Sequence, residues 1–118
     1  MVNNVSNTLP AIYKYLDKKV MKEFKSSGCD AIYNERKRQI EEEHYDENHD
    51  KNELIENLIW GAAAYATACR RFWPWDLKYF KPGDLTISGV RRDLVKAGAL
   101  IAAAIDKIDR GETSELEP

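Results

Sequence analysis

Apolar residues recur every three or four positions in four segments of the chain, a spacing that predicts amphipathic α-helices. The predicted helices cover about residues 8–26, 30–43, 51–72 and 89–110. Residues with capping preferences flank them: Thr8, Asp30, Asp50 and Ser88 as N-caps, Pro10 in a first turn, and Gly28 and Gly111 after helix ends. The pattern therefore predicts an all-α fold.

The third and fourth predicted helices are rich in alanine, which lets two helix backbones approach closely. The apolar stripe of the third helix comprises Leu54, Ile55, Leu58, Ile59, Ala62, Tyr65, Ala66 and Cys69. The stripe of the fourth helix comprises Leu94, Ala97, Gly98, Ile101, Ile105 and Ile108. We expect residues 51–72 and 89–110 to form an antiparallel pair with a long aromatic loop between them, and long loops are often functional.

The second predicted helix carries large polar side chains on its apolar side. At about 100° per residue, Arg36 and Gln39 fall on the same side as Ile32 and Ile40. A buried guanidinium or amide needs hydrogen-bond partners. This face is therefore expected to meet either a polar ligand or internal carboxylates. In the second case a network with Glu43, Asp50 or Asp93 would specify the helix arrangement and bind no ligand.

Basic and aromatic residues gather around the loop that follows residue 72. Trp73, Trp75 and Lys81 lie within this loop, and Arg91 and Arg92 open the fourth helix. Arginine forks near a helix N-terminus suit a phosphate, and aromatic rings can stack on a nucleobase. Alternatively, the aromatic residues simply attach the loop to the helix pair, because aromatic side chains usually contribute core area.

Length and composition are those of one globular domain. The 118 residues are 43% apolar and 32% charged, so we expect a single domain over residues 1–118 with a flexible tail at 111–118. The net charge of −2 gives no reason to expect binding to duplex DNA, and the apolar stretch at 59–69 is too short to span a membrane. Two cysteines without a CxxC spacing and a start without a secretory signal predict a cytoplasmic protein.

Acidic and histidine residues cluster before the third helix, but their spacing matches no strong metal signature. His49, Asp50 and Glu53 are weak candidates for metal ligands, and the favoured interpretation is a solvated loop with a helix cap. Two pairs have spacings like those of magnesium-binding all-α nucleotide pyrophosphohydrolases: Glu53 with Glu56, and Asp106 with Asp109. Helical phase places Glu53, Glu56 and Asp106 in water. The sequence therefore leans against an enzyme and predicts no catalytic residue, metal or cofactor.

Four blocks of the sequence resemble a family of small phage and prophage proteins. The blocks are ERKRQI at 35–40, HD at 49–50, WPWD at 73–76 with KP at 81–82, and RRDLVKAGALIAAAIDKIDR at 91–110. The similarity covers a core at about 30–110, with the N-terminal helix of residues 1–29 outside it. The chain departs from the family pattern at Glu43-His44 and Ala103-Ala104-Ile105, where Glu-Gly and Ala-Glu-Ile are common. The family has no settled activity, so the resemblance implies a phage origin and a helical fold.

These observations lead to one functional hypothesis and two alternatives. The leading hypothesis is a non-enzymatic phage accessory protein that counters host defence by binding a nucleotide-like or phosphorylated ligand, such as an immune signal. The expected binding residues are Arg36, Gln39, Trp73, Trp75, Lys81, Arg91 and Arg92. The alternatives are an inhibitor that binds a host or CRISPR-type defence enzyme, and a magnesium-dependent nucleotide pyrophosphohydrolase. Exposed apolar area on the first helix would permit a homodimer or higher homo-oligomer.

Overall fold

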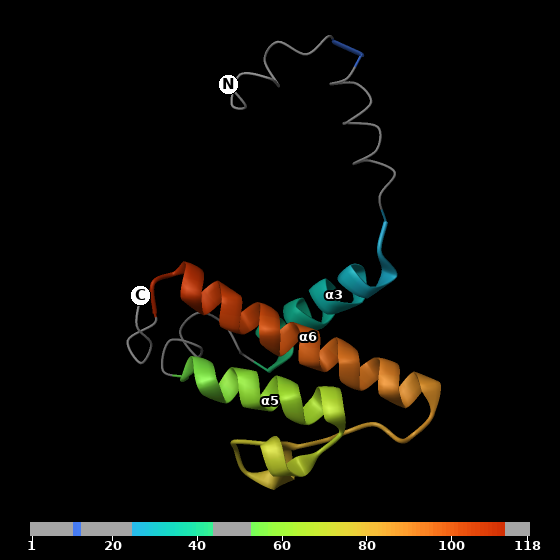
Figure 1. The fold of residues 1–118 in the computed structure, drawn as a ribbon, viewed down its shortest axis with the longest axis vertical. Helices are drawn as coiled ribbons and strands as arrows, with labels where there is room; N and C mark the ends of the chain where they lie inside the picture. Colours follow the sequence, from blue (N-terminus) through green and yellow to red (C-terminus); the bar gives the residue numbers. More distant parts are fainter. Residues whose placement is uncertain (1–10, 13–24, 44–52, 113–118) are drawn as a thin grey trace.

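The described part of the chain is all-α, as predicted. The computed structural model describes residues 11–12, 25–43 and 53–112, and all structural statements below refer to these residues. They contain three long helices, α3 (Ser27–Glu42), α5 (Ile55–Thr67) and α6 (Ile87–Asp109) (Figure 1). Two short 3₁₀ helices, η1 (Arg70–Phe72) and η2 (Leu77–Tyr79), lie in the segment between α5 and α6.

Helices α5 and α6 pack against each other as an antiparallel pair (Figure 1). Their interface is the hydrophobic core, formed by Ile55, Leu58, Ala62 and Tyr65 of α5 and by Ala97, Leu100, Ala103 and Ala104 of α6. Small side chains on both helices keep the backbones close. At Gly61 there is no room for a side chain: a Cβ atom there would lie 2.6 Å from Cζ3 of Trp75 and 3.3 Å from Cδ1 of Leu100.

Helix α3 crosses α6 on a different side from α5 (Figure 1). The crossing depends on Gly98 of α6, because a Cβ atom at this position would overlap the Ile32 side chain of α3. Gly98 thus gives Ile32 a place to pack. As a result, the polar residues of α3 that follow Ile32 lie beside the α5–α6 pair.

The boundaries of the helices differ from the predicted ones at their ends. Ser26 caps α3 by accepting a hydrogen bond from the Cys29 backbone N–H at 3.1 Å, so the expected cap at Asp30 and the expected helix end at Gly28 are wrong. Helix α5 begins at Ile55 instead of about residue 51, and it has no side-chain cap. It ends at Thr67 because Ala68 adopts a left-handed conformation with φ 53°, which halts the α-helix before η1.

The cap of α6 is also shifted, from the expected Ser88 to Thr86, whose side chain accepts a hydrogen bond from Gly89 N–H at 3.1 Å. The predicted first helix lies largely outside the described residues, as do the expected cap Asp50 and most of the expected tail. Within the described ranges, no helix combines the length and apolar character needed to cross a membrane.

The predicted apolar stripe of the fourth helix is wrong for its large members. Leu94, Ile101, Ile105 and Ile108 are each about half exposed, whereas the buried positions are those of a neighbouring stripe: Val95, Ala97, Ala99, Leu100, Ala103, Ala104 and Lys107. Ile59 and Ala66 of α5 are likewise exposed, as is Leu54, which precedes the helix. Close approach of the two helices selects the alanine-rich faces for the interface, and this displaces the bulky isoleucines to its edge.

The aromatic loop of residues 73–86 packs onto the helix pair through its rings and its backbone. Trp73, Trp75 and Phe80 contact the core cluster. The Lys81 backbone N–H donates to the Tyr65 hydroxyl at 3.2 Å. Farther along, the loop is held by Asp93, whose buried carboxylate accepts a hydrogen bond from Gly83 N–H at 2.8 Å.

Candidate functional site

A cavity of about 820 Å³ lies between α3, α6, α5 and the aromatic loop. Small-molecule sites in proteins have volumes in this range. One wall comes from α3: Glu35, Arg36, Arg38, Gln39 and Glu43. Helix α6 contributes Arg92, Lys96, Leu100 and Ala103, and α5 contributes Leu58 and Tyr65. The loop side supplies Trp73, Trp75, Asp76, Tyr79 and Lys81, with Glu53 from the segment before α5.

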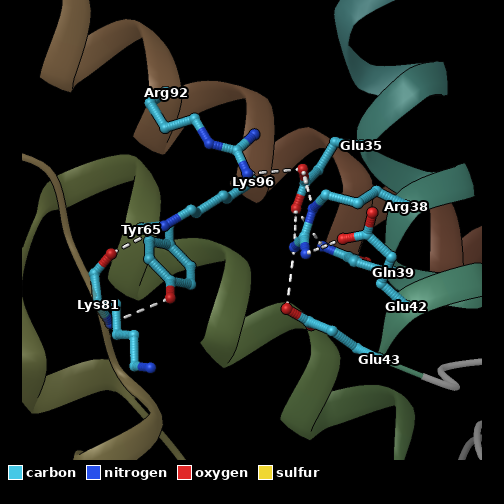
Figure 2. A network of polar contacts seen from close by, with 9 residues as sticks. All are labelled: Glu35, Arg38, Gln39, Glu42, Glu43, Tyr65, Lys81, Arg92 and Lys96. Atoms are coloured by element: carbon cyan, nitrogen blue, oxygen red, sulfur yellow. Dashed lines mark hydrogen bonds and ion pairs between the residues drawn. The ribbon is translucent and has the colours of Figure 1, made fainter.

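Glu35 is the centre of the polar wall, and only 3% of the residue is exposed. Its carboxylate accepts two hydrogen bonds from the fork of Arg38, from Nε at 2.9 Å and from Nη2 at 2.8 Å. Arg92 reaches across from α6 and places Nη2 2.7 Å from Glu35 Oε1 (Figure 2). Gln39 adds a fourth contact, in which Nε2 donates to Glu35 Oε2 at 3.2 Å. A single buried carboxylate therefore links α3 to α6.

The charges of this network stabilise one another. Burial by itself raises the pKa of Glu35, but the hydrogen bonds and positive charges of Arg38 and Arg92 outweigh it and lower the pKa from 4.5 to about 2. The hydrogen bond to Glu35 raises the pKa of Arg38 above its ordinary value, and Glu43 contributes through a contact of 3.0 Å. Glu35 is thus fully ionised near neutral pH.

Two cations stand one turn apart on the α6 side of the cavity. Arg92 pairs with Glu35, and the Lys96 ammonium donates to the Lys81 backbone carbonyl at 2.8 Å and lies 5.0 Å from the centre of the Tyr65 ring (Figure 2). Burial, and next the charge of Arg92, lower the pKa of Lys96. An anion beside Lys96 would favour the charged form of this lysine, which burial and the charge of Arg92 now disfavour.

The wall formed by the loop is aromatic, and the indole N–H groups of its tryptophans are hydrogen-bonded. Trp73 Nε1 donates to the Asp76 carbonyl at 2.9 Å, and Trp75 Nε1 donates to Glu53 Oε1 at 2.7 Å. The two indoles meet edge to face with ring centres 4.9 Å apart, and Trp73 also contacts Tyr65 edge to face. These rings attach the loop to the helix pair, as one interpretation predicted, and Trp73 and Trp75 also line the cavity.

Gln39 is nearly buried, with 5% of its surface exposed, and lines the cavity. Its amide nitrogen contacts Glu35. Within the part of the chain that the structure describes, its amide oxygen Oε1 is buried and accepts no hydrogen bond. Most buried carbonyl oxygens have a partner, so this atom calls for an explanation.

Six of the seven binding residues expected from the sequence line this one cavity: Arg36, Gln39, Trp73, Trp75, Lys81 and Arg92. Arg36 also lies 3.5 Å from Asp106 of α6. The seventh, Arg91, is exposed and is not part of the cavity wall, because it is one position round the helix from Arg92.

Sequence reasoning did not expect ligand binding by the other eleven lining residues, which include Glu35, Arg38, Tyr65 and Lys96; it expected Glu43 only as an internal partner of Arg36 and Gln39. A signal existed for two of them. Glu35 precedes Gln39 by four residues and Lys96 follows Arg92 by four, so each pair shares a helix face. Tyr65 was assigned to the core stripe, where it is indeed buried, but its hydroxyl and ring edge also face the cavity wall.

The expected position of Glu53 and Glu56 in water is wrong. Glu53 precedes the first turn of α5, so helical phase does not apply to it, and its carboxylate turns to Trp75. Glu56 is partly buried, and its Oε1 atom accepts no hydrogen bond from the described residues. Among the described residues no group of three metal-ligating side chains gathers, and the candidates His49 and Asp50 lie outside them.

The polar residues of the cavity carry mixed charge. The cations are Arg36, Arg38, Lys81, Arg92 and Lys96, and the carboxylates are Glu35, Glu43, Glu53 and Asp76. No protein-family model matches this chain, and no curated protein or solved structure matches it either. What the cavity can bind therefore follows from its own geometry and charge.

Proposed function

We propose that the cavity binds a small nucleotide-like or phosphorylated ligand and does not catalyse a reaction of it. The observation that supports this proposal is that tryptophan rings from the aromatic loop and a pair of cations from α6 line the same cavity. Base stacking on Trp75 and charge-assisted hydrogen bonds from Arg92 and Lys96 to a phosphate would satisfy both walls at once.

The anion is expected at the α6 side. A phosphate oxygen between Arg92 and Lys96 would offset the burial and the repulsion from Arg92 that now lower the pKa of Lys96. Lys81, whose backbone is hydrogen-bonded to Tyr65 and Lys96, adds a third cationic residue to the lining of the cavity. Arginine and lysine together are the usual protein partners of phosphate groups.

Sequestration is the biological role that we propose for this binding. The cavity has a binding wall but, among the described residues, no group of side chains that could hold a metal ion. In the phage setting that the sequence resemblance implies, a non-enzymatic binder in the host cytoplasm would lower the free concentration of a host signalling nucleotide. Such a role requires affinity and abundance but no catalytic group.

Calorimetry against nucleoside mono-, di- and triphosphates and cyclic nucleotides tests the proposal. Lys96→Met keeps the apolar stem of the side chain but removes its charge, and we expect it to weaken binding about 10- to 100-fold, the usual effect of losing a hydrogen bond to a charged group. Arg91→Met is the matched control, because Arg91 is exposed on the same helix and outside the cavity. Absence of binding by every nucleotide, or equal losses in both variants, would refute the proposal.

A second candidate function, inhibition of a host defence enzyme by direct contact, is favoured by one surface feature. Trp60 of α5 is half exposed and stacks on Phe72 of η1 with ring centres 5.6 Å apart, beside the exposed Ile59. Exposed aromatic residues of this kind often anchor protein interfaces. Pull-down of a defence enzyme by the wild type but not by Trp60→Ala would support this function, and retention by both would contradict it.

A further inference from the structure

The amide oxygen of Gln39 shows which kind of group a ligand must present. Gln39 lies in the middle of the α3 wall, and its Oε1 atom is buried without a hydrogen-bond donor in the described structure. The amide nitrogen of the same side chain donates a hydrogen bond to the Glu35 carboxylate. The unsatisfied atom is therefore one acceptor at a known position.

The orientation of this amide is determined by Glu35. An ionised carboxylate only accepts hydrogen bonds, and Arg38 and Arg92 keep Glu35 ionised. The amide nitrogen, which only donates, must therefore face Glu35 at 3.2 Å, as Figure 2 shows. Turning the amide over would place two oxygens against each other. The acceptor consequently cannot exchange places with the donor to suit a different ligand.

A buried acceptor without a partner favours ligands that supply a hydrogen-bond donor. A ligand that brings an N–H group to Oε1 gains a hydrogen bond, whereas a ligand without one leaves the oxygen desolvated and unpaired. Phosphate cannot serve at neutral pH, because its oxygens are acceptors. The part of a nucleotide that offers N–H donors on a flat, stackable body is the base.

We infer that Gln39 Oε1 accepts a hydrogen bond from an amino group of a purine base, so that the cavity selects amino-bearing purine nucleotides. The inference rests on the proposed function and deepens it by naming the class of ligand. It places the base beside α3 and the tryptophans, and the phosphate toward Arg92 and Lys96. Gln39 is then a specificity-determining residue, while the two cations supply affinity.

Two pairs of nucleotides that differ by one amino group test the inference in the wild-type protein. Guanosine monophosphate is compared with inosine monophosphate, which lacks the 2-amino group, and adenosine monophosphate with purine riboside monophosphate, which lacks the 6-amino group. In at least one pair we expect the amino-bearing member to bind about tenfold more tightly or better, as measured by calorimetry.

Gln39→Met tests the assignment to this residue. Methionine has a similar length and no strong acceptor, so the variant should bind both members of the discriminating pair equally, mainly through loss of affinity for the amino-bearing one. A cooperative thermal transition of the variant shows that it is folded. Because the comparison of nucleotides needs no variant, it remains decisive even if Gln39→Met unfolds.

The outcomes separate this inference from the proposed function. Equal binding within both pairs overturns the inference and leaves nucleotide binding standing. Discrimination that persists in folded Gln39→Met overturns the assignment to Gln39. Discrimination that instead follows the 2′-hydroxyl, seen as a loss of binding by the 2′-deoxy nucleotides, places the donor on the sugar and also overturns the inference. If none of the four nucleotides binds, the inference falls, and the wider nucleotide series decides the proposed function on its own.

Discussion

Replacing Glu35 by glutamine should destabilise the protein strongly at neutral pH and progressively less as the pH falls below 4.5. Glutamine has nearly the same shape but no charge, and its amide nitrogen would face donors that now point to a carboxylate oxygen. The one remaining oxygen could serve either the donors that now contact Oε1, from Arg38 and Arg92, or those that contact Oε2, from Arg38 and Gln39, and the other set would be left without an acceptor. The connection between α3 and α6 would weaken as a result.

Two lines of reasoning give the magnitude. A carboxylate with a pKa of about 2 in the folded protein and 4.5 otherwise contributes about 3 kcal/mol at pH 7. Breaking a fully buried ion pair costs about 3–5 kcal/mol. The side chains of Arg38 and Arg92 are 33% and 43% exposed, so water partly compensates their loss and the lower end applies. We expect a loss of about 3 kcal/mol in the free energy of unfolding.

Urea unfolding of both proteins between pH 7 and pH 3 measures this loss. The folded pKa of Glu35 is depressed, so its stabilisation is complete above pH 4.5 and disappears as the pH falls toward about 2. The gap between wild type and Glu35→Gln should therefore narrow steadily below pH 4.5. Glu41→Gln is the control, because Glu41 lies on the same helix with 61% of its side chain exposed. A gap at pH 7 no larger than the control's, or one that does not narrow in acid, would refute the reasoning.

Three further substitutions have defined consequences for stability in urea unfolding. Gly61→Ala should cost about 1–3 kcal/mol and change tryptophan fluorescence, because its Cβ would lie 2.6 Å from Trp75; an unchanged spectrum would contradict this contact. Gly28→Ala should instead stabilise by up to about 1 kcal/mol, since its nearest neighbour would be 3.8 Å away, and a net loss would count against the helical assignment of this position. Asp93→Ala should cost about 1–3 kcal/mol by leaving Gly83 N–H unpaired, and equal stability would show that the loop is held by other contacts.

The candidate site shows where reasoning from helical phase succeeds and where it fails. Arg36 and Gln39 were expected on the inward face of a helix, and both line the cavity. Arg91 and Arg92 are neighbours in the sequence and could not be told apart by composition, yet only Arg92 reaches Glu35. Glu53 was misplaced because it was assumed to be helical, and the start of α5 at Ile55 frees it to contact Trp75.

Local periodicity was sufficient to predict the all-α class, the three described helices and the antiparallel pairing of α5 with α6, because these depend on residues a few positions apart. The faces that meet were not determined in this way. Leu94 and Ile101 are more hydrophobic than Ala97 and Ala103, but the alanines form the interface because close backbone approach gains more packing than large side chains held apart. The same holds for the cavity, whose walls come from residues as far apart in the chain as Glu35 and Ala103. Contacts over such distances arise from how the helices cross, and the crossing at Gly98 depends on the shape of Ile32 on another helix.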